Sequence, residues 1–356
     1  FTFSPQGTIA SWDGNKATKT YSLPVQASWS IDLFGNLLNV KRSAQMSLLA
    51  TKDYQLVVKT GLISNIANMY YTLMMLDKQL ELVNNMANLT KDTWNLMKLQ
   101  KELGRAKETS VQSAESNYYS VLAQSADLKR QIRETENSFS LLLGQPAQTI
   151  SRGKLENQSL PSEFSTGIGV QLLSNRPDVH YAEMSLAQCF YDTNQARSRF
   201  YPSITISGSG AYTNNSGGGI VNPGKMLWNA VGSLTQPIFA HGQLIAGLKV
   251  AKAKQEQAYN TWQNAVLSAG SEVSNALVLY NSSDEKSKLE AKQVESLQKN
   301  VEYAKMLFSQ GQGTTYLEVI TAQQSLLNAQ LSKVADDFYK MQAVVNLYYA
   351  LGGGRN

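Results

Sequence analysis

Few residues in this chain are suited to catalysis or to metal binding. The sequence contains a single cysteine, Cys189, and two histidines, His180 and His241, which lie far apart. One thiol excludes an internal disulfide framework and a cysteine metal cluster, and the histidines lack a metal-binding spacing. We find no Ser/His/Asp set and no carboxylate pair with a reason to be catalytic. The residues therefore predict a protein that is not an enzyme and holds no cofactor or metal.

The charge pattern also excludes a nucleic-acid-binding surface. Of the 356 residues 17% are charged, below the usual quarter. The net charge is +5, but Lys and Arg are mixed with Asp and Glu along predicted helical faces. This mixture indicates ordinary solvated faces. No run of 18 apolar residues predicts a membrane-spanning helix, and no signal peptide is visible.

The chain contains its own pattern twice, at an offset of about 208 residues. Leu141–Gln145 aligns with Tyr349–Gly353, and Leu33-Phe34 aligns with Ile238-Phe239 at an offset of 205, so about three residues are inserted between. Each copy predicts two strands followed by a long helical hairpin. The second copy is preceded by a predicted helix at 176–199 that the first copy lacks. We therefore expect a further N-terminal segment before residue 1.

Two segments alternate strictly between apolar and mostly polar residues. Residues 21–33 have seven apolar side chains at every second position, and residues 204–213 follow the same period. Weaker partner strands are expected at 1–10 and about 226–237, joined by polar loops at 11–20 and 214–225, which gives two hairpins. The alternation alone fits a half-buried soluble sheet equally well. Strands of 10–13 residues with aromatic side chains toward their ends instead favour crossing a bilayer.

Four such strands cannot close a barrel, and open sheet edges are not tolerated in lipid. Two chains would supply eight strands, whose interior side chains just fill. Three chains would supply twelve strands and leave a lumen. A trimer is therefore the smallest assembly that forms a pore.

Four long segments predict helices far longer than those of ordinary globular proteins. All eight prolines fall outside 36–102, 106–143, 243–310 and 316–350. The first and third segments, each about 67 residues, would be roughly 100 Å long as continuous helices. Apolar residues recur in heptads, with Gln324 the one polar position in the last segment, so coiled-coil packing is expected. Glycine-containing turns at 103–107 and 310–316 place both hairpin tips at one end, far from the strands.

Pro and Gly residues mark the junctions of strand and helix. Gly35, Pro202, Pro237 and Gly242 lie where a tilted strand is expected to turn into a helix. Arg176-Pro177-Asp178 is expected to begin a helix, because Pro suits the first turn and Asp its positive end.

Taken in order and spacing, several stretches resemble the TolC family of outer-membrane efflux proteins, in its OprM-like branch. The resemblance covers nearly the whole chain. The stretches are Trp29–Gly35, Asn175–Val179, Phe200–Ile204, Leu234–Phe239, Tyr316–Val319 with Ala322-Gln323, and Ala350–Gly354.

The resemblance implies a mixed α and β membrane protein. Three chains would form a twelve-stranded outer-membrane β-barrel, four strands per chain, continuous with a periplasmic α-barrel of twelve coiled-coil helices. The implied divisions are a first barrel hairpin (1–34), a first helical hairpin (35–144), an equatorial linker (145–175), a helix leading to the barrel (176–200), a second barrel hairpin (201–239), a second helical hairpin (240–351) and a tail (352–356). Residues 147–174 and the C-terminus would form a girdle around the tunnel.

The resemblance also implies a function and partners. Such proteins are passive exit ducts of tripartite efflux pumps or type I secretion systems in the Gram-negative outer membrane, conducting small molecules such as drugs. The expected partners are two further copies, a periplasmic adaptor and an inner-membrane transporter of RND, ABC or MFS type, together with outer-membrane lipid. Members of this branch are often lipoproteins with an N-terminal lipidated cysteine. Cys189 cannot be that residue, because it lies within a predicted helix.

The resemblance further assigns site residues by position. Glu318, with Tyr316 and Thr321, lies at the periplasmic aperture, where three copies of Glu318 would form an anionic ring that favours cations. Thr321 replaces a carboxylate typical of the family, so the aperture should be less acidic. Adaptor-docking tips are expected at Gly104, Arg105 and Ala106 and at Gly311, Gln312, Gly313 and Thr314.

Simpler interpretations stay open. Glu318 is equally consistent with a solvated or salt-bridged coiled-coil residue, and Arg105 with a merely exposed loop charge. The alternative function is a non-conducting periplasmic helical-hairpin adaptor with a soluble sheet, although an adaptor needs only one helical hairpin.

Overall fold

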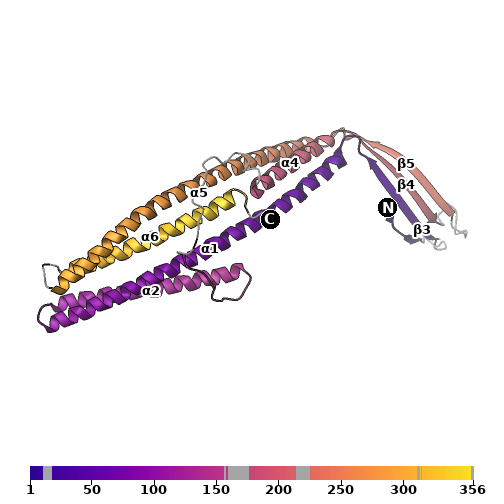
Figure 1. Cartoon of the computed structure of the whole chain (residues 1–356). Helices are drawn as coiled ribbons and strands as arrows, with labels where there is room; N and C mark the ends of the chain where they lie inside the picture. The colour runs from indigo at the N-terminus through magenta and orange to yellow at the C-terminus, as the bar shows by residue number, and fades with distance from the viewer. Residues whose placement is uncertain are drawn as a thin grey trace. The chain divides into compact units, whose positions relative to one another are not determined.

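The computed structural model describes residues 1–10, 18–155, 158, 176–213, 225–310, 313 and 315–353 (Figure 1). These residues divide into two compact units, which we call the sheet unit (1–52 and 181–264) and the helix unit (53–180 and 265–356). The elements are, in order, β1 (Thr2–Phe3), β2 (Gln6–Ala10), β3 (Thr18–Ile31), α1 (Asn36–Glu102), α2 (Glu108–Leu142), α4 (Pro177–Ser198), β4 (Ser203–Thr213), β5 (Lys225–Thr235), α5 (Gln243–Gln310) and α6 (Tyr316–Ala350).

The long helices lie where the sequence predicted them. Three of the four have the expected bounds, and α2 begins two residues later and ends one earlier than expected. The delay arises because Lys107, at φ −85° and ψ 153°, is still extended and forms the N-cap. α1 and α5 have 67 and 68 residues, and α2 and α6 have 35 each. Within the described part of the chain, no helix combines the length and the hydropathy needed to span a membrane.

The strands form one antiparallel sheet in the order β3–β4–β5, with β1 and β2 both paired along the free side of β3. The predicted hairpins are confirmed with shifted bounds. The first predicted strand is interrupted around Pro5, which has no N–H to give to the ladder, and so becomes β1 and β2. The strand predicted from residue 21 begins at Thr18, inside the expected loop, and ends at Ile31.

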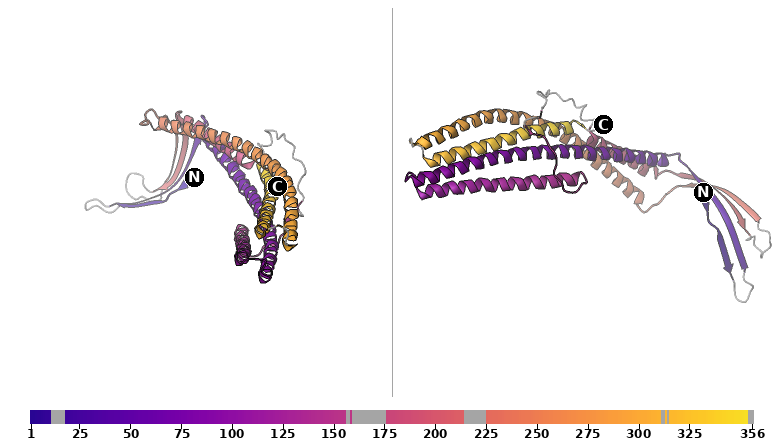
Figure 2. Two further views of the ribbon diagram at one scale, coloured as in Figure 1. Left: turned by 90° about the vertical axis from the view of Figure 1, so that its left-hand side faces the viewer. Right: turned by 60° about the horizontal axis from the view of Figure 1, so that its bottom comes forward.

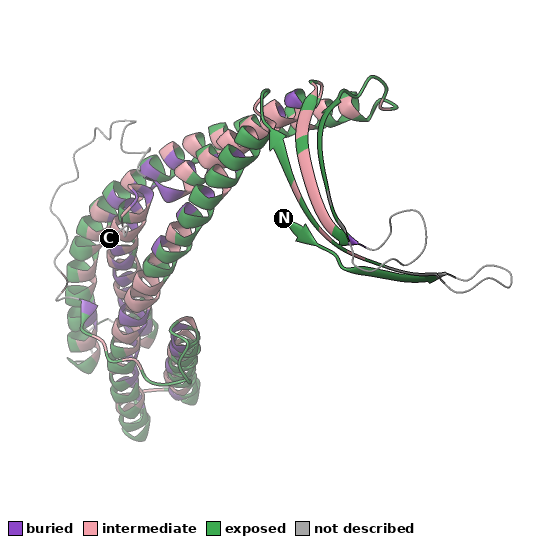
Figure 3. Cartoon of the chain, turned by 90° about the vertical axis from the view of Figure 1, so that its right-hand side faces the viewer, coloured by how far each residue is buried: buried purple, intermediate pink, exposed green. Residues whose placement is uncertain are grey.

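The register gathers the apolar side chains on one face of the sheet. Trp29 lies opposite Ile206, which lies opposite Gly232, and on the other face Ser30, Thr205 and Ser233 form the neighbouring row. Among the described residues this apolar face is uncovered, because Trp29 and Trp228 are 77% and 83% exposed. Figure 3 shows β3 and β5 coloured mostly as exposed. A single chain therefore leaves a large apolar surface in contact with its surroundings.

Polar bonds join the helices of the sheet unit. Ser43 Oγ on α1 donates to Asp192 Oδ1 on α4 at 2.7 Å. Thr193 Oγ1 on α4 donates to the Ala251 carbonyl of α5 at 3.2 Å. α4 is thus hydrogen-bonded to the first turns of both long helices.

In the helix unit, α1, α2, α5 and α6 share a core, and they lie side by side in Figure 2. The main cluster takes its members from α1 (Val83, Met86, Ala87), α2 (Val121), α5 (Val301) and α6 (Ala322, Leu326, Leu327). The predicted heptads are buried in the middle of α6, at Leu327, Val334 and Phe338, whereas Leu317 and Tyr348 at its ends are exposed. Apolar periodicity thus identified the packing face but not how far one chain covers it.

Side-chain amides and hydroxyls link the helices at intervals. Asn84 on α1 accepts from Ser125 on α2 at 2.8 Å, and Gln323 on α6 donates to Thr93 on α1 at 2.9 Å. Gln324, the polar exception in the heptads, donates to Asn117 on α2 at 3.1 Å. Ser125, Thr93 and Gln323 are buried, so a shift of the helices by one turn would leave these groups without their partners, which favours one register.

The two shorter helices end in the same way. Gly144 and Gly352, with φ of 68° and 78°, follow α2 and α6 in the left-handed conformation that favours glycine. The next amides, of Gln145 and Gly353, donate to the carbonyls of Ser140 and Tyr348 at 2.9 and 3.0 Å. Both ends are Schellman motifs.

Arg176 joins three elements of the helix unit. Its side chain is 2% exposed, and its Nη2 lies 2.6 Å from Asp178 Oδ2 and 2.7 Å from Glu272 Oε2 on α5. Its Nη1 donates to the carbonyl of Ala350, the last residue of α6, at 3.2 Å. The sequence suggested only a helix start here, whereas the guanidinium also binds a carbonyl that the end of α6 leaves unpaired.

We predict that Arg176→Ala lowers the free energy of unfolding by roughly 3 kcal/mol, because buried hydrogen-bonding groups lose their partner. Arg176→Lys should lie between the two, since an ammonium keeps the charge but lacks the planar fork. Denaturant unfolding of the protein in detergent measures the effect. Arg105→Ala, at an exposed turn, is the control, and equal losses in the two alanine variants would contradict this role.

Candidate functional site

The first hairpin tip presents Arg105 to solvent. Gly104, with φ 71°, reverses the chain, and the Arg105 amide donates to the Gln100 carbonyl at 2.8 Å. The Arg105 side chain is exposed, while Ala106 packs against the cluster of Met97, Val111 and Ala114. Of the three residues expected to dock an adaptor here, one therefore offers a charge outward and one is anchored inward.

The second tip is described only in part. Gly311, Gln312 and Thr314 lie outside the described residues, and Gly313 is exposed with φ 65°. Thr315 is the N-cap of α6: its Oγ1 accepts from the Glu318 amide at 3.4 Å, and Glu318 Oε2 accepts from the Thr315 amide at 3.2 Å. This is a capping box, which satisfies amides that the start of a helix leaves unpaired.

Glu318 therefore has a local role that neither sequence interpretation included. Its carboxylate is exposed and completes the cap of α6. The signal was present, because Thr-x-x-Glu is the sequence signature of a capping box. The equivalent start of α2, at Lys107, has no side-chain cap.

The other two residues assigned to the aperture differ in how far they are buried. Thr321 is exposed, and its Oγ1 donates to the Leu317 carbonyl at 2.8 Å. Tyr316 is half-buried in the apolar cluster of the tip, with its ring 6.4 Å from that of Phe308. Burial raises the pKa of the Tyr316 hydroxyl above its usual range. Tyr316 therefore packs the hairpins together, and only Glu318 and Thr321 are presented outward.

The predicted strand–helix junctions lie together in the sheet unit. Gly35 and Gly242 have φ of 73° and 76°, and their carbonyls accept the amides of Asn39 and Ala246 at 2.9 Å. Each glycine therefore opens a long helix. Pro202 and Pro237 flank β4 and β5, just outside the ladder.

Two further contacts at these junctions were not predicted. The rings of Phe34 and Tyr201 stack with centroids 4.8 Å apart. Asp32 Oδ2 accepts the Leu38 amide at 2.8 Å and so caps the start of α1. His241 has φ 47°, which is uncommon for a residue with a side chain.

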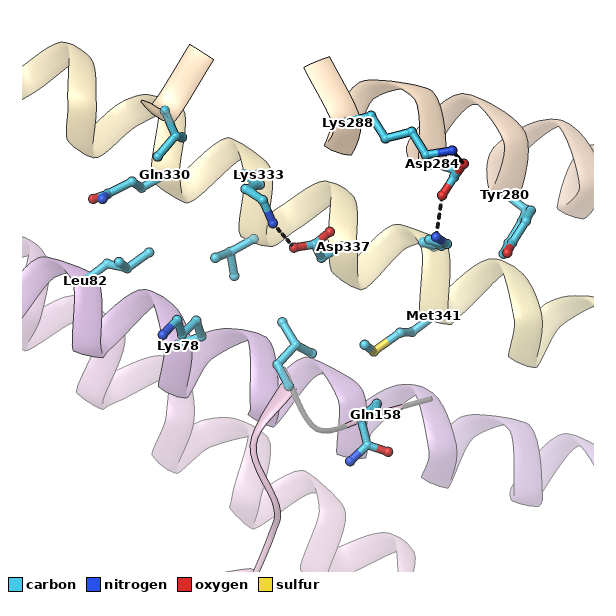
Figure 4. A pocket seen from close by; sticks show the side chains of 14 residues that line it. Lys78, Leu82, Gln158, Tyr280, Asp284, Lys288, Gln330, Lys333, Asp337 and Met341 are labelled. Carbon is cyan, nitrogen blue, oxygen red and sulfur yellow. Dashed lines mark hydrogen bonds and ion pairs between the residues drawn. The ribbon is translucent and has the colours of Figure 1, made fainter. Parts of the chain in front are cut away.

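A groove of about 740 Å³ lies on the helix unit, between α1, α5 and α6 (Figure 4). Asp284 on α5 binds Lys288 at 2.6 Å and also binds Lys340 on α6. Lys333 and Asp337 on α6 pair at 2.7 Å. The sequence had suggested only scattered solvated charges, but the spacing by three, four and seven residues along α6 places several of them on one helical face.

Two carboxyls meet near this groove. Asp336 on α6 is buried and lies 3.4 Å from Lys286 Nζ. Glu290 on α5 has a buried Oε2 without a hydrogen-bond partner among the described residues. Burial, followed by the nearby Asp336 charge, raises the pKa of Glu290, and Lys286 opposes this only in part. Within the described ranges, no three His, Cys, Asp or Glu side chains are arranged to hold a metal ion.

Comparison with known proteins identifies the family. The family model described as "Outer membrane efflux protein" matches residues 4–145 and 168–353. The chain belongs to the outer membrane efflux protein family. The predicted resemblance to TolC-family channels is therefore confirmed, and the protein is an outer-membrane efflux component of Gram-negative type. Family members are channels rather than enzymes.

The relatives cover nearly the whole chain. "Cation efflux system protein CusC" of Escherichia coli K12 is 27% identical over 354 residues, which are 97% of this chain and 76% of the relative. "Pyoverdine export outer membrane protein OpmQ" of Pseudomonas aeruginosa is 29% identical over 350 residues, 98% of this chain and 73% of the relative.

Solved structures of outer-membrane channels share the fold. A structure of the outer membrane protein VceC of Vibrio cholerae superposes with a TM-score of 0.90 at 21% identity, covering 100% of this chain and 87% of that one. A structure of CusC gives 0.89 at 24% identity, covering 99% and 82%. The efflux family weighs against the alternative of a periplasmic adaptor.

The burial of Glu290 beside Asp336 is expected to make the free energy of unfolding of this efflux protein depend on pH. Because the pKa of Glu290 in the folded state is above its ordinary value of 4.5, its contribution is fully present below pH 4.5 and is lost as pH rises through the raised pKa. We therefore expect Glu290→Gln to be more stable than the native protein at pH 7, by about 1 kcal/mol, and to lose this advantage near pH 4.

Thermal unfolding in detergent across pH 4–8 measures this difference. The control is Glu295→Gln on the same helix, because the hydrogen bond from Lys299 lowers the pKa of Glu295 and its replacement should bring no gain at pH 7. A Glu290→Gln variant that is less stable at pH 7 would show that the carboxylate is stabilising there.

Proposed function

We propose that three copies of this chain form the outer-membrane exit duct of a tripartite efflux pump. The observation that carries the proposal is the sheet: one face is apolar and exposed, and the outer sides of β1/β2 and β5 have no further strand among the described residues. In lipid, unpaired N–H and C=O groups at such edges are too costly to remain open. Pairing of β5 with the β1/β2 edge of the next copy satisfies both edges, and three copies close twelve strands around a lumen.

The proposed duct wall derives from an internal duplication. α6 begins and ends 208 residues after α2, and the glycines that open α1 and α5 are 207 residues apart. Both shorter helices end in the same glycine motif. Two similar halves per chain give six per trimer, so the twelve long helices would continue the barrel as a pseudo-sixfold tunnel. The domain divisions expected from the sequence follow this plan.

The duct is passive and needs partners for energy and selection. Among relatives, CusC is named for cation efflux, OpmQ for pyoverdine export and TtgI for toluene efflux. These cargoes differ widely, which supports a general conduit for small molecules, drugs among them, whose cargo an inner-membrane transporter selects. A periplasmic adaptor would dock on the two hairpin tips, at Gly104–Ala106 and at residues 311–314.

The aperture of the proposed duct involves Glu318 and Thr321 as exposed residues and Tyr316 as the packing residue that holds them in place. Three Glu318 carboxylates near one axis would favour cations. Because Thr321 carries no charge, the ring is expected to be only weakly selective.

Oligomeric state tests the duct directly. The purified chain should require detergent or lipid and should elute as a trimer, with its mass determined by light scattering. A monomer that stays in solution without detergent would contradict the duct, because the exposed apolar face would then have no lipid to contact.

The role of Glu318 is tested with a variant that keeps the helix cap. Gln satisfies the same capping box, so Glu318→Gln should retain stability while removing the charge. We expect a reduced preference for cations in planar lipid bilayers, by about two- to fivefold in permeability ratio. Glu108→Gln, in the first turn of α2, is the control. Unchanged selectivity in Glu318→Gln would limit Glu318 to capping.

A further inference from the structure

The groove on the helix unit has an apolar floor that the core holds in place. Leu82 on α1, Leu155, and Val334 and Met341 on α6 line it. The last three belong to a buried cluster with Met74, and Leu82 packs against that cluster. The floor is thus rigid, and its volume of about 740 Å³ matches that of small-molecule pockets, which run from roughly 300 to 1,000 Å³.

The rim carries an excess of positive charge. Four lysines line the groove, Lys78 from α1, Lys288 from α5, and Lys333 and Lys340 from α6, against two aspartates, Asp284 and Asp337. Glu81, one turn after Lys78 on α1, also pairs with the Lys78 ammonium at 3.1 Å, so four lysines face three carboxylates. Asp284 is shared between Lys288 and Lys340, so one carboxylate neutralises only part of two ammonium groups. Lys340 is also held over the Tyr280 ring, 5.5 Å from its centre.

Partial burial strengthens this field. The side chains of Lys78 and Lys340 are only 22% and 25% exposed. Charges at such sites are screened less by water and salt than fully exposed charges, so they attract an anion more strongly. In Figure 4, Lys78 on α1 lies across the groove from Lys333 on α6.

We propose that this lysine-rimmed groove is a binding site for amphiphilic anions, which place an apolar body on the Leu155 and Val334 floor and a carboxylate or sulfonate among the lysines. The size favours a small molecule over a protein, because a stable protein interface buries about 800 Å² on each partner. A bound ligand contacts α1 from the first hairpin and α5 and α6 from the second, and so joins the two hairpins. The site does not depend on the proposed duct.

The experiment compares dodecanoate with dodecanol, two probes of equal chain length of which only the first is charged. Equilibrium dialysis of the radiolabelled probes against the full chain in an uncharged detergent, with protein-free detergent as the blank, measures binding. We expect Lys78→Gln/Lys333→Gln to weaken dodecanoate binding at least about tenfold, since charge-assisted contacts are lost, and to leave dodecanol binding unchanged.

A gain of affinity provides the sharper test. Asp337→Asn removes a carboxylate that competes for Lys333, so dodecanoate should bind about threefold more tightly, an effect that misfolding does not produce. Lys299→Gln, an exposed lysine of α5 outside the groove, is the control. A circular dichroism spectrum and a gel-filtration elution volume equal to those of the native protein confirm that each variant is folded.

Equal dodecanoate binding by the native protein and both groove variants would overturn the proposal and assign the probe to another surface, such as the apolar sheet face. Absence of saturable dodecanoate binding would also overturn it. So would displacement of dodecanoate by polyglutamate but not by excess dodecanol, which would indicate a partner with an acidic segment.

Discussion

An apolar sheet face with unpaired edges is the constraint on which the rest of the structure depends. Trp29 and Trp228 are largely exposed on that face within the part of the chain that the structure describes. In water such a surface would drive aggregation, and in lipid the open edges of β1/β2 and β5 would leave backbone groups unpaired. A bilayer can surround the apolar face with lipid, whereas the backbone groups at the edges can be hydrogen-bonded only by further strands.

The long helices have a different physical requirement, because they must stay in one register relative to one another. Apolar stripes alone allow neighbouring helices to slide by a turn at small cost. The Asn84–Ser125 and Thr93–Gln323 hydrogen bonds oppose such a shift, because the buried Ser125, Thr93 and Gln323 side chains would lose these partners. The more exposed Asn117–Gln324 hydrogen bond is a further link. Arg176 has the same effect at the end of α6, because it donates to the Ala350 carbonyl and also pairs with Glu272 on α5.

The two halves of the chain differ where a partner would meet them. The tip before α2 carries the exposed Arg105 and has no side-chain cap, whereas α6 begins with the Thr315–Glu318 capping box. The start of α6 is therefore stabilised by local hydrogen bonds, and the turn before α2 by packing of Ala106 on the apolar cluster. In the proposed duct, the two hairpin tips would in this way present two chemically distinct surfaces to a partner.

The sequence by itself determined the helix bounds, the alternating strands and the family, because these depend on local periodicity, on glycine and proline positions and on short motifs. The positions of Gly35, Gly104 and Gly242 could be predicted since each adopts a positive φ that glycine favours. The capping role of Glu318 was already encoded in its Thr-x-x-Glu spacing. Only the tertiary structure decided that Tyr316 packs into the apolar cluster of the tip, because its partners there come from other helices. The Arg176 contacts and the lysine-rimmed groove could not be predicted, because their partners are about 100 to 260 residues apart and meet only when the hairpins pack.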